Sequence, residues 1–270
     1  MTFFNKNKSQ GFTLIELIVV IGIIGLIIGL ILVSLQTSRE KARIAKGKQF
    51  SQMINHTLGA YAVGIWRFEE IGAGNTLVDN SGYNNNGVTH GATLEAGVLG
   101  NCLEFNGVNS YVEIANSGSM TNEEMTVEAW IYPRDISSLQ MIVSKFGTNK
   151  DYGLGVSNGH IYVWYGQGGG DYTNEAGTIK SYKWQHVALV LKSWDSYEVY
   201  IDGKLVGSES MTIPQRASST ANIEIGRAGG SVQSHYFNGL IDEVKIYSQA
   251  FPSAQIKQHY VKTRDFYVKN

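Results

Sequence analysis

Residues 6–25 determine what kind of segment begins the chain, and they read K-N-K-S-Q-G-F-T-L-I-E-L-I-V-V-I-G-I-I-G. A short basic leader ends at Gly11, and a single acidic residue, Glu16, precedes seventeen apolar or glycine residues from Leu17 to Val33. A carboxylate at the membrane end of such a run is costly unless it finds a partner. This cost makes Glu16 a candidate functional residue.

Two ordinary interpretations of this stretch fail. A secretory signal peptide would carry small residues after its apolar core, and here the chain continues S-L-Q-T-S-R from Ser34. A plain membrane anchor fits by length, since residues 12–35 exceed the roughly 20 residues that cross the hydrocarbon. It explains neither Glu16 nor the string G-F-T-L-I-E.

That string resembles the signal of type IV pilins and pseudopilins. The resemblance implies that a prepilin peptidase cuts between Gly11 and Phe12 and that the new amino terminus on Phe12 is methylated. It also implies that the Glu16 carboxylate of one subunit meets the Phe12 amine of its neighbour, which neutralises both charges inside an apolar bundle. The subunit would sit in the bacterial cytoplasmic membrane before assembly and in an extracellular filament at the cell surface afterwards.

Helical periodicity continues behind the apolar run. The apolar residues of this segment recur at helical spacing, namely Phe50, Met53, Ile54, Leu58 and Tyr61. We therefore expect three parts: a leader peptide at 1–11, one helix at 12–62 with its transmembrane part at about 12–35, and a globular domain at 63–270.

The globular part has the sequence pattern of an all-β protein. From Gly64 onward glycine is frequent, and short alternating segments, the first expected at Ile65–Glu69, are separated by turn residues. Many short strands argue for an antiparallel sandwich, and Pro252 to Arg264 is expected to form a terminal helix. The single cysteine, Cys102, excludes an intramolecular disulfide, and the net charge of −1 gives a nucleic-acid partner no support.

An ordered set of motifs runs through this domain. It comprises W-R-F-E-E (66–70), D-N-S-G-Y-N-N-N-G (79–87), L-E-F-N-G (103–107), M-T-V-E-A-W-I-Y-P (125–133), W-Q-H-V-A-L-V (184–190), V-Y-I-D-G-K (199–204) and Y-F-N-G-L-I-D-E-V-K-I-Y (236–247). Together the motifs resemble the laminin-G-like, concanavalin A-like jelly roll of many bacterial surface proteins. The expected fold is therefore a long amino-terminal α-helix followed by such a sandwich and a short carboxy-terminal helix, in which Trp66, Trp130 and Trp184 belong to the core.

Enzymatic activity is not expected. Hydrolases of this architecture place acids at alternate positions of one strand, so that both enter one cleft. The sequence has no such run: Glu128 stands alone, and Asp242 and Glu243 are adjacent, so that in a regular strand they face opposite ways.

A structural calcium ion is a possible cofactor. Related sandwiches hold calcium near the start and end of the domain, and the acids suited to that by position are Glu69, Asp79 and Asp242. Calcium takes carboxylate and carbonyl oxygens. The alternative is that Asp79 makes local turn hydrogen bonds and that Asp242 binds backbone amides.

The segment H-I-Y-V-W-Y (160–165) suggests a ligand-binding face. Strand alternation places His160, Tyr162 and Trp164 on one side, where an aromatic row could stack on sugar rings, and a loop carrying Trp194 could border it. The alternative is that the row packs under loops or against a neighbouring subunit.

These features predict a type IV pilus-like filament subunit, in particular a minor pilin, whose sandwich serves adhesion or recognition. Its partners would be other pilin subunits, the prepilin peptidase, the inner membrane, and a glycan or surface protein. One alternative is a pseudopilin of a type II-like secretion system that contacts cargo, and another is a purely structural filament subunit.

The processing site gives a first prediction. The assembled protein should begin with N-methyl-Phe12, which mass spectrometry of the mature amino terminus detects. A bulky replacement of Gly11 should block cleavage, because the peptidase needs a small residue there. An intact Met1 terminus on assembled protein would overturn the pilin interpretation.

The charge pair gives a second prediction. Glu16→Ala should leave cleavage and membrane insertion intact but impair incorporation into filaments, because an unpaired Phe12 amine would remain in the apolar bundle. Immunoblots of sheared filament and membrane fractions measure both steps. Normal incorporation would show that the pair is not needed.

Overall fold

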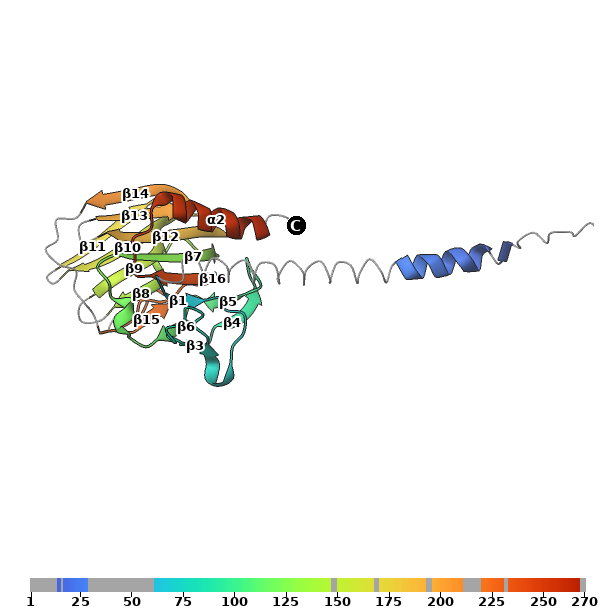
Figure 1. Ribbon diagram of the computed structural model, residues 1–270, viewed down its shortest axis with the longest axis horizontal. Coiled ribbons are helices and arrows are strands. Elements are labelled where there is room, and N and C mark those ends of the chain that lie inside the picture. The colour runs from blue at the N-terminus through green and yellow to red at the C-terminus, as the bar shows by residue number, and fades with distance from the viewer. Residues whose placement is uncertain are drawn as a thin grey trace, which may run out of the picture. The chain divides into compact units, whose positions relative to one another are not determined.

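The computed structural model describes residues 14–15, 17–28, 61–146, 150–167, 170–192, 196–210, 220–230 and 233–267 (Figure 1). The chain divides into two compact units, residues 1–46 and residues 47–270. The cleavage site at Gly11 and Phe12, the acid Glu16 and most of the predicted helix beyond residue 28 lie outside the described residues.

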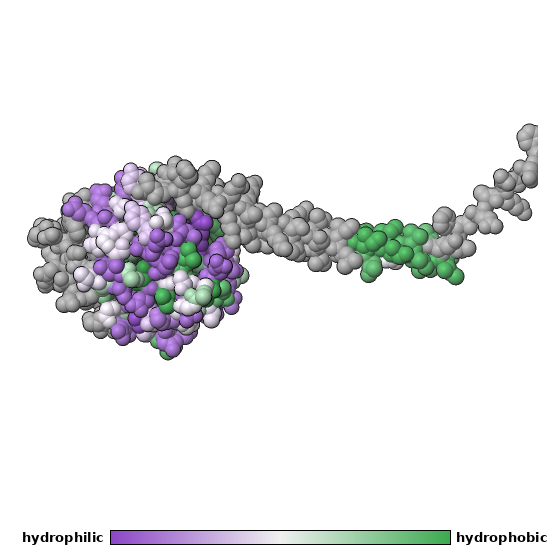
Figure 2. All heavy atoms as spheres, turned by 60° about the horizontal axis from the view of Figure 1, so that its bottom comes forward, coloured by the Kyte–Doolittle hydropathy of each residue, from purple (hydrophilic) through white to green (hydrophobic). Residues whose placement is uncertain are grey.

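The amino-terminal unit is helical at residues 14–15 and 17–28, as the sequence predicts. Its large apolar side chains are exposed all round the helix, and Figure 2 shows this segment as continuously hydrophobic, in contrast to the mostly hydrophilic face of the sandwich in that view. Among the described residues, no helix is both long and apolar enough to span a bilayer.

The second unit is a sandwich of two eight-stranded antiparallel sheets, which confirms the predicted architecture. Sheet A contains, in spatial order, β14 (Lys204–Ser210), β13 (Ser196–Ile201), β12 (Gln185–Lys192), β7 (Met125–Pro133), β16 (Asn238–Tyr247), β5 (Asn101–Asn106) and β4 (Thr93–Ala96), with β1 (Ala62–Trp66) also paired to β16. Sheet B contains β11 (Gly170–Ala176), β10 (His160–Gln167), β9 (Lys150–Ser157), β8 (Gln140–Phe146), β15 (Ile223–Ile225), β6 (Tyr111–Ile114), β3 (Gly87–His90) and β2 (Thr76–Leu77). Two short 3₁₀ turns are η1 (Ala73–Asn75) and η2 (Gly118–Met120).

The core lies between the sheets and is built by strand alternation. On β12, Val187, Leu189 and Leu191 enter the core, while the side chains between them point to the outer face of sheet A. Trp66 joins this core as predicted. Trp130 and Trp184 are also buried, but they form a separate cluster on the outer side of sheet A, together with Cys102 of β5 and Tyr260 of the carboxy-terminal helix.

Two details of the strands differ from the sequence-based expectation. Strand β1 spans Ala62–Trp66 rather than Ile65–Glu69, because Ala62 pairs with β16 and because Phe68 has a left-handed φ of 54°, incompatible with a continued strand. Strand β16 is not regular at its acids: Glu243 has a φ of 50°, and the register shifts between Asp242 and Lys245. Ile241 and Val244, on either side of the two acids, both lie in the core, so simple alternation does not describe Asp242 and Glu243. Glu243 forms an ion pair with Lys245 at 2.7 Å.

The carboxy-terminal helix α2 (Ser253–Tyr267) covers part of the outer face of sheet A (Figure 1). Ile256 packs on apolar side chains of β12 and β13, and Tyr260 stacks on Trp130 with ring centroids 5.7 Å apart. His259 Nδ1 lies 2.9 Å from a carboxylate oxygen of Glu128, and both side chains are buried. Burial alone would raise the pKa of Glu128, but the charge and hydrogen bond of His259 hold it below its ordinary value.

His186 lies beneath α2 beside this pair. Its ring centroid is 5.5 Å from that of Trp130, and its buried Nδ1 atom has no hydrogen-bond partner among the described residues. Burial lowers the pKa of His186 to about 4. The folded protein therefore keeps this ring neutral at pH values at which the unfolded chain protonates it.

This burial predicts a pH dependence of stability. As the pH falls from about 6.5 towards about 4, the unfolded state binds a proton at His186 that the folded state does not, so His186 should cost on the order of 3 kcal/mol of unfolding free energy. Urea denaturation of native protein and His186→Phe at pH 7 and pH 4.5 measures this, and the variant should lose much less stability on acidification. If both proteins lose the same unfolding free energy between pH 7 and pH 4.5, His186 does not cause the acid sensitivity.

Candidate functional site

The aromatic row predicted at residues 160–165 lies on the outer face of sheet B. On β10, Ile161, Val163 and Tyr165 are buried in the core, while Tyr162 and Trp164 are partly exposed on the other side, as strand alternation predicts. The two outward rings meet edge to face, with centroids 6.3 Å apart. The structure therefore brings Tyr162 and Trp164 together as one platform.

The platform is supported from the neighbouring strands. Phe146 of β8 packs against Trp164 with ring centroids 4.7 Å apart, and Met141 belongs to the same cluster. Gly153 lies opposite Trp164 on β9, and a Cβ there would come within 2.6 Å of Met141 and 2.7 Å of Phe146. The glycine thus makes room for the side chains that hold Trp164 in place.

The other two predicted members of the row have different positions. His160 is half-buried, and its Nδ1 hydrogen-bonds the carbonyl oxygen of Gly177, which ties the start of β10 to the segment that follows β11. This contact is structural and does not extend the platform. Trp194 lies outside the described residues.

A polar cluster lies farther across sheet B, around the segment that follows β15. Arg227 pairs with Glu224, both side chains being more than nine-tenths buried, and its guanidinium carbon lies 3.3 Å from the centre of the Tyr111 ring. Ala228 of the same segment packs in the cluster that includes Trp164. This segment therefore borders the platform on one side, a feature that the sequence analysis missed because the contacts join distant parts of the chain.

Two acids stand side by side in this polar cluster. Glu113 on β6 lies directly opposite Glu224 on β15, a cross-strand pair that a search within single strands cannot find. Each already has a partner: Arg227 binds Glu224, and the Asn222 side-chain amide donates to Glu113. Neither has the free position of a general acid or nucleophile, and the absence of catalysis stays a prediction.

The residues predicted to hold calcium are divided among different contacts. Asp79 accepts four hydrogen bonds, from the amides of Ile65, Ser81 and Asn85 and from the Ser81 hydroxyl, at 2.7–2.9 Å. This is the local turn role that the sequence analysis named as the alternative. All of these donors compete with a cation for the same two oxygens.

The carboxylates of Asp242 and Glu69 both lie against the turn at residues 97–100. Asp242 Oδ2 accepts the amides of Val98 and Leu99, and the Glu69 carboxylate lies against Gly100. Burial and then the charge of Glu243 raise the pKa of Asp242 well above its ordinary value. Within the described residues, no group of three or more His, Cys, Asp or Glu side chains is arranged to hold a metal.

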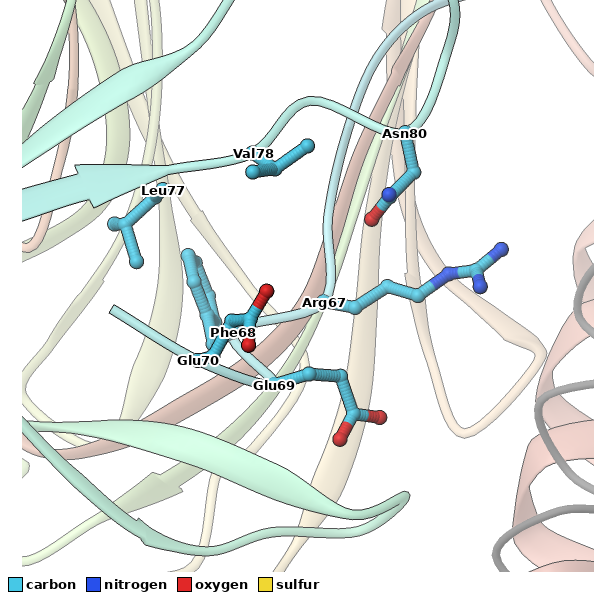
Figure 3. A pocket seen from close by; sticks show the side chains of 7 residues that line it. All are labelled: Arg67, Phe68, Glu69, Glu70, Leu77, Val78 and Asn80. Carbon is cyan, nitrogen blue, oxygen red and sulfur yellow. The ribbon is translucent and has the colours of Figure 1, made fainter. Parts of the chain in front are cut away.

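Glu69 lines a small pocket at the end of β1. Its walls are formed by Arg67, Phe68, Glu69, Glu70, Leu77, Val78 and Asn80, and its volume is about 220 Å³. Figure 3 shows Arg67, Glu69 and Asn80 extending to one side, away from Leu77. Ligand pockets usually occupy roughly 300–1,000 Å³, so this one is small for an oligosaccharide. Calcium binding here stays a prediction.

Comparison with known proteins gives one match in the amino-terminal segment and one in the sandwich. Residues 6–32 match the prokaryotic N-terminal methylation motif, and residues 106–257 match the concanavalin A-like lectin/glucanases superfamily. No curated protein matches the chain.

Solved structures show the same fold at low identity. The binding domain of Paraclostridial Mosquitocidal Protein 1 is 18% identical with a TM-score of 0.64, and the botulinum neurotoxin serotype D binding domain is 17% identical with a TM-score of 0.62. The matches cover 75% and 76% of this chain and 52% of each of those chains, so the match spans about half their length. Domain 4 of AbnA, an arabinanase of Geobacillus stearothermophilus, in complex with arabinotriose, is 18% identical with a TM-score of 0.59, over 73% of this chain and 97% of that one.

The chain thus joins a pilin-like processing motif to a lectin-like sandwich, and its larger part belongs to the concanavalin A-like lectin/glucanases superfamily.

Proposed function

We propose that this protein is a minor subunit of a type IV pilus-like filament that displays a non-catalytic, glycan-binding sandwich at the cell surface. Processing by a prepilin peptidase and pairing of Glu16 with a neighbour's Phe12 amine would build the chain into the filament. The subunit would be held in the cytoplasmic membrane before assembly.

The observation that carries the recognition half of the proposal is the Tyr162–Trp164 platform. Aromatic rings offer a large apolar area with few rotatable bonds, and a sugar ring has an apolar face that can lie against them. The rings are partly exposed and are held from below by Phe146, so little ordering is required on binding. The arabinotriose complex of AbnA domain 4 supports an oligosaccharide as the kind of ligand to test.

A glycan array tests the platform. Trp164→Ala should reduce the strongest glycan signals at least roughly tenfold, about 1.4 kcal/mol of binding free energy, because the stacking surface is removed. Circular dichroism checks that the variant is folded. Tyr83→Ala is a matched control, since Tyr83 is also an exposed aromatic residue but follows β2 at the far edge of sheet B.

Two results would count against this assignment. If Trp164→Ala unfolds the domain, Trp164 is a packing residue, and Tyr162→Ala becomes the test of the platform. If the native protein gives no array signal, the structural-subunit and cargo-contacting alternatives take its place.

A further inference from the structure

A second group of aromatic side chains lies on the outer face of sheet A, next to the area that α2 covers. Tyr132 of β7 is two residues beyond Trp130 on the same face of that strand. Trp184 packs on Tyr132 with ring centroids 5.7 Å apart. The Tyr182 ring also contacts Tyr132, edge to face, with ring centroids 6.3 Å apart. The strip formed by Tyr132, Tyr182 and Trp184 is on the opposite sheet from the Tyr162–Trp164 platform.

Tyr182 is the exposed member of this strip. Its relative exposure is 65%, and its φ of 56° is left-handed, a conformation that costs a non-glycine residue on the order of 1 kcal/mol. The turn is fixed to the end of β7, because the Tyr182 amide donates to the Pro133 carbonyl at 2.7 Å. The chain thus holds a large aromatic ring in solvent at some cost in backbone energy.

A charged pair borders the strip. Arg134 lies 2.6 Å from a carboxylate oxygen of Glu104, and the two side chains are 35% and 31% exposed. Glu104 stands opposite Leu240, which in turn stands opposite Tyr132, so the pair and the rings share one end of the outer face. Here a guanidinium supplies donors and a carboxylate supplies acceptors beside an apolar surface.

We propose that Tyr132, Tyr182 and Trp184, together with Glu104 and Arg134, form a second glycan site for a neutral oligosaccharide. The exposed Tyr182 ring would stack on the apolar face of one sugar, Tyr132 and the buried Trp184 would support it, and neighbouring hydroxyl groups would donate to Glu104 and accept from Arg134. The site does not depend on the platform of sheet B. Two sites on opposite sheets would let one subunit bind two glycan chains, which raises avidity on a dense surface.

The test uses the full mature chain in detergent micelles on a printed array of neutral oligosaccharides. Four proteins are compared: native, Trp164→Ala, Tyr182→Asn and the double variant. Asparagine tolerates the left-handed conformation, so Tyr182→Asn removes the ring without adding backbone strain. Trp164→Ala should keep a set of glycan signals that the double variant loses by roughly tenfold or more.

Further variants separate the ring from the polar pair. Tyr182→Phe should keep binding, because the ring is retained, and Glu104→Gln should weaken the same signals as Tyr182→Asn. Tyr83→Asn, which removes an exposed tyrosine beside sheet B, should change none of the signals that Trp164→Ala leaves.

The outcomes distinguish the two sites. If the double variant equals Trp164→Ala on every glycan, and Glu104→Gln has no effect, the sheet A site is refuted while the sheet B platform stands. If Tyr182→Asn alone abolishes binding and Trp164→Ala does nothing, the sheet A site stands and the platform fails. If the native chain binds no glycan, both are overturned.

Discussion

Each strand of the sandwich places every second side chain in the space between the two sheets. The side chains between them must therefore point to the outer face of the sheet. Ile161, Val163 and Tyr165 are fixed in the core, so Tyr162 and Trp164 must face outward. A register slip of one residue would exchange these sets and bury the polar face, which makes the alternation costly to violate. The outward rows are therefore a consequence of core formation, whether or not they bind anything.

Each outer face is partly covered, but by a different element. On sheet A, α2 covers one area and buries ionisable groups there, with Glu128 paired to His259 and His186 kept neutral. A buried ion pair adds little net stability compared with apolar packing, but losing one partner is costly, so we expect the pair to help specify where α2 docks. On sheet B, the segment after β15 performs a similar covering role through Arg227, Glu224 and Ala228. The aromatic groups that stay open lie beside these covers.

The amino-terminal unit differs from the sandwich in the distribution of its apolar side chains. Its described helix is apolar on all sides, a pattern that has no stable place in water and needs lipid or other helices around it. Burial among neighbouring helices would supply the assembly energy of the proposed filament, whereas the sandwich has a hydrophobic core of its own. In the filament proposed above, this separation would let one chain combine a polymerising helix with a displayed recognition domain.

Local patterns in the sequence were sufficient for the architecture. The apolar run after Glu16, the alternation on β10 and the terminal helix depend on residues close together in the chain, and the helix, the sandwich and the outward Tyr162–Trp164 row were predicted correctly. Trp66, Trp130 and Trp184 are all buried, as predicted. The sequence did not show that Trp130 and Trp184 belong to a smaller cluster on the outer side of sheet A, because alternation does not say which outer face a helix will cover.

Only the tertiary structure decided the rest. Asp79, Asp242 and Glu69 look equivalent as calcium ligands in the sequence, but folding gives the oxygens of Asp79 and Asp242 to amide donors and leaves Glu69 at a small pocket. The ring that Tyr182 contacts belongs to Tyr132 of β7, 50 residues earlier in the chain, and the Glu113–Glu224 pair joins two distant strands. Such pairings depend on strand order and register, which are set by the packing of the whole sandwich rather than by any local run of residues.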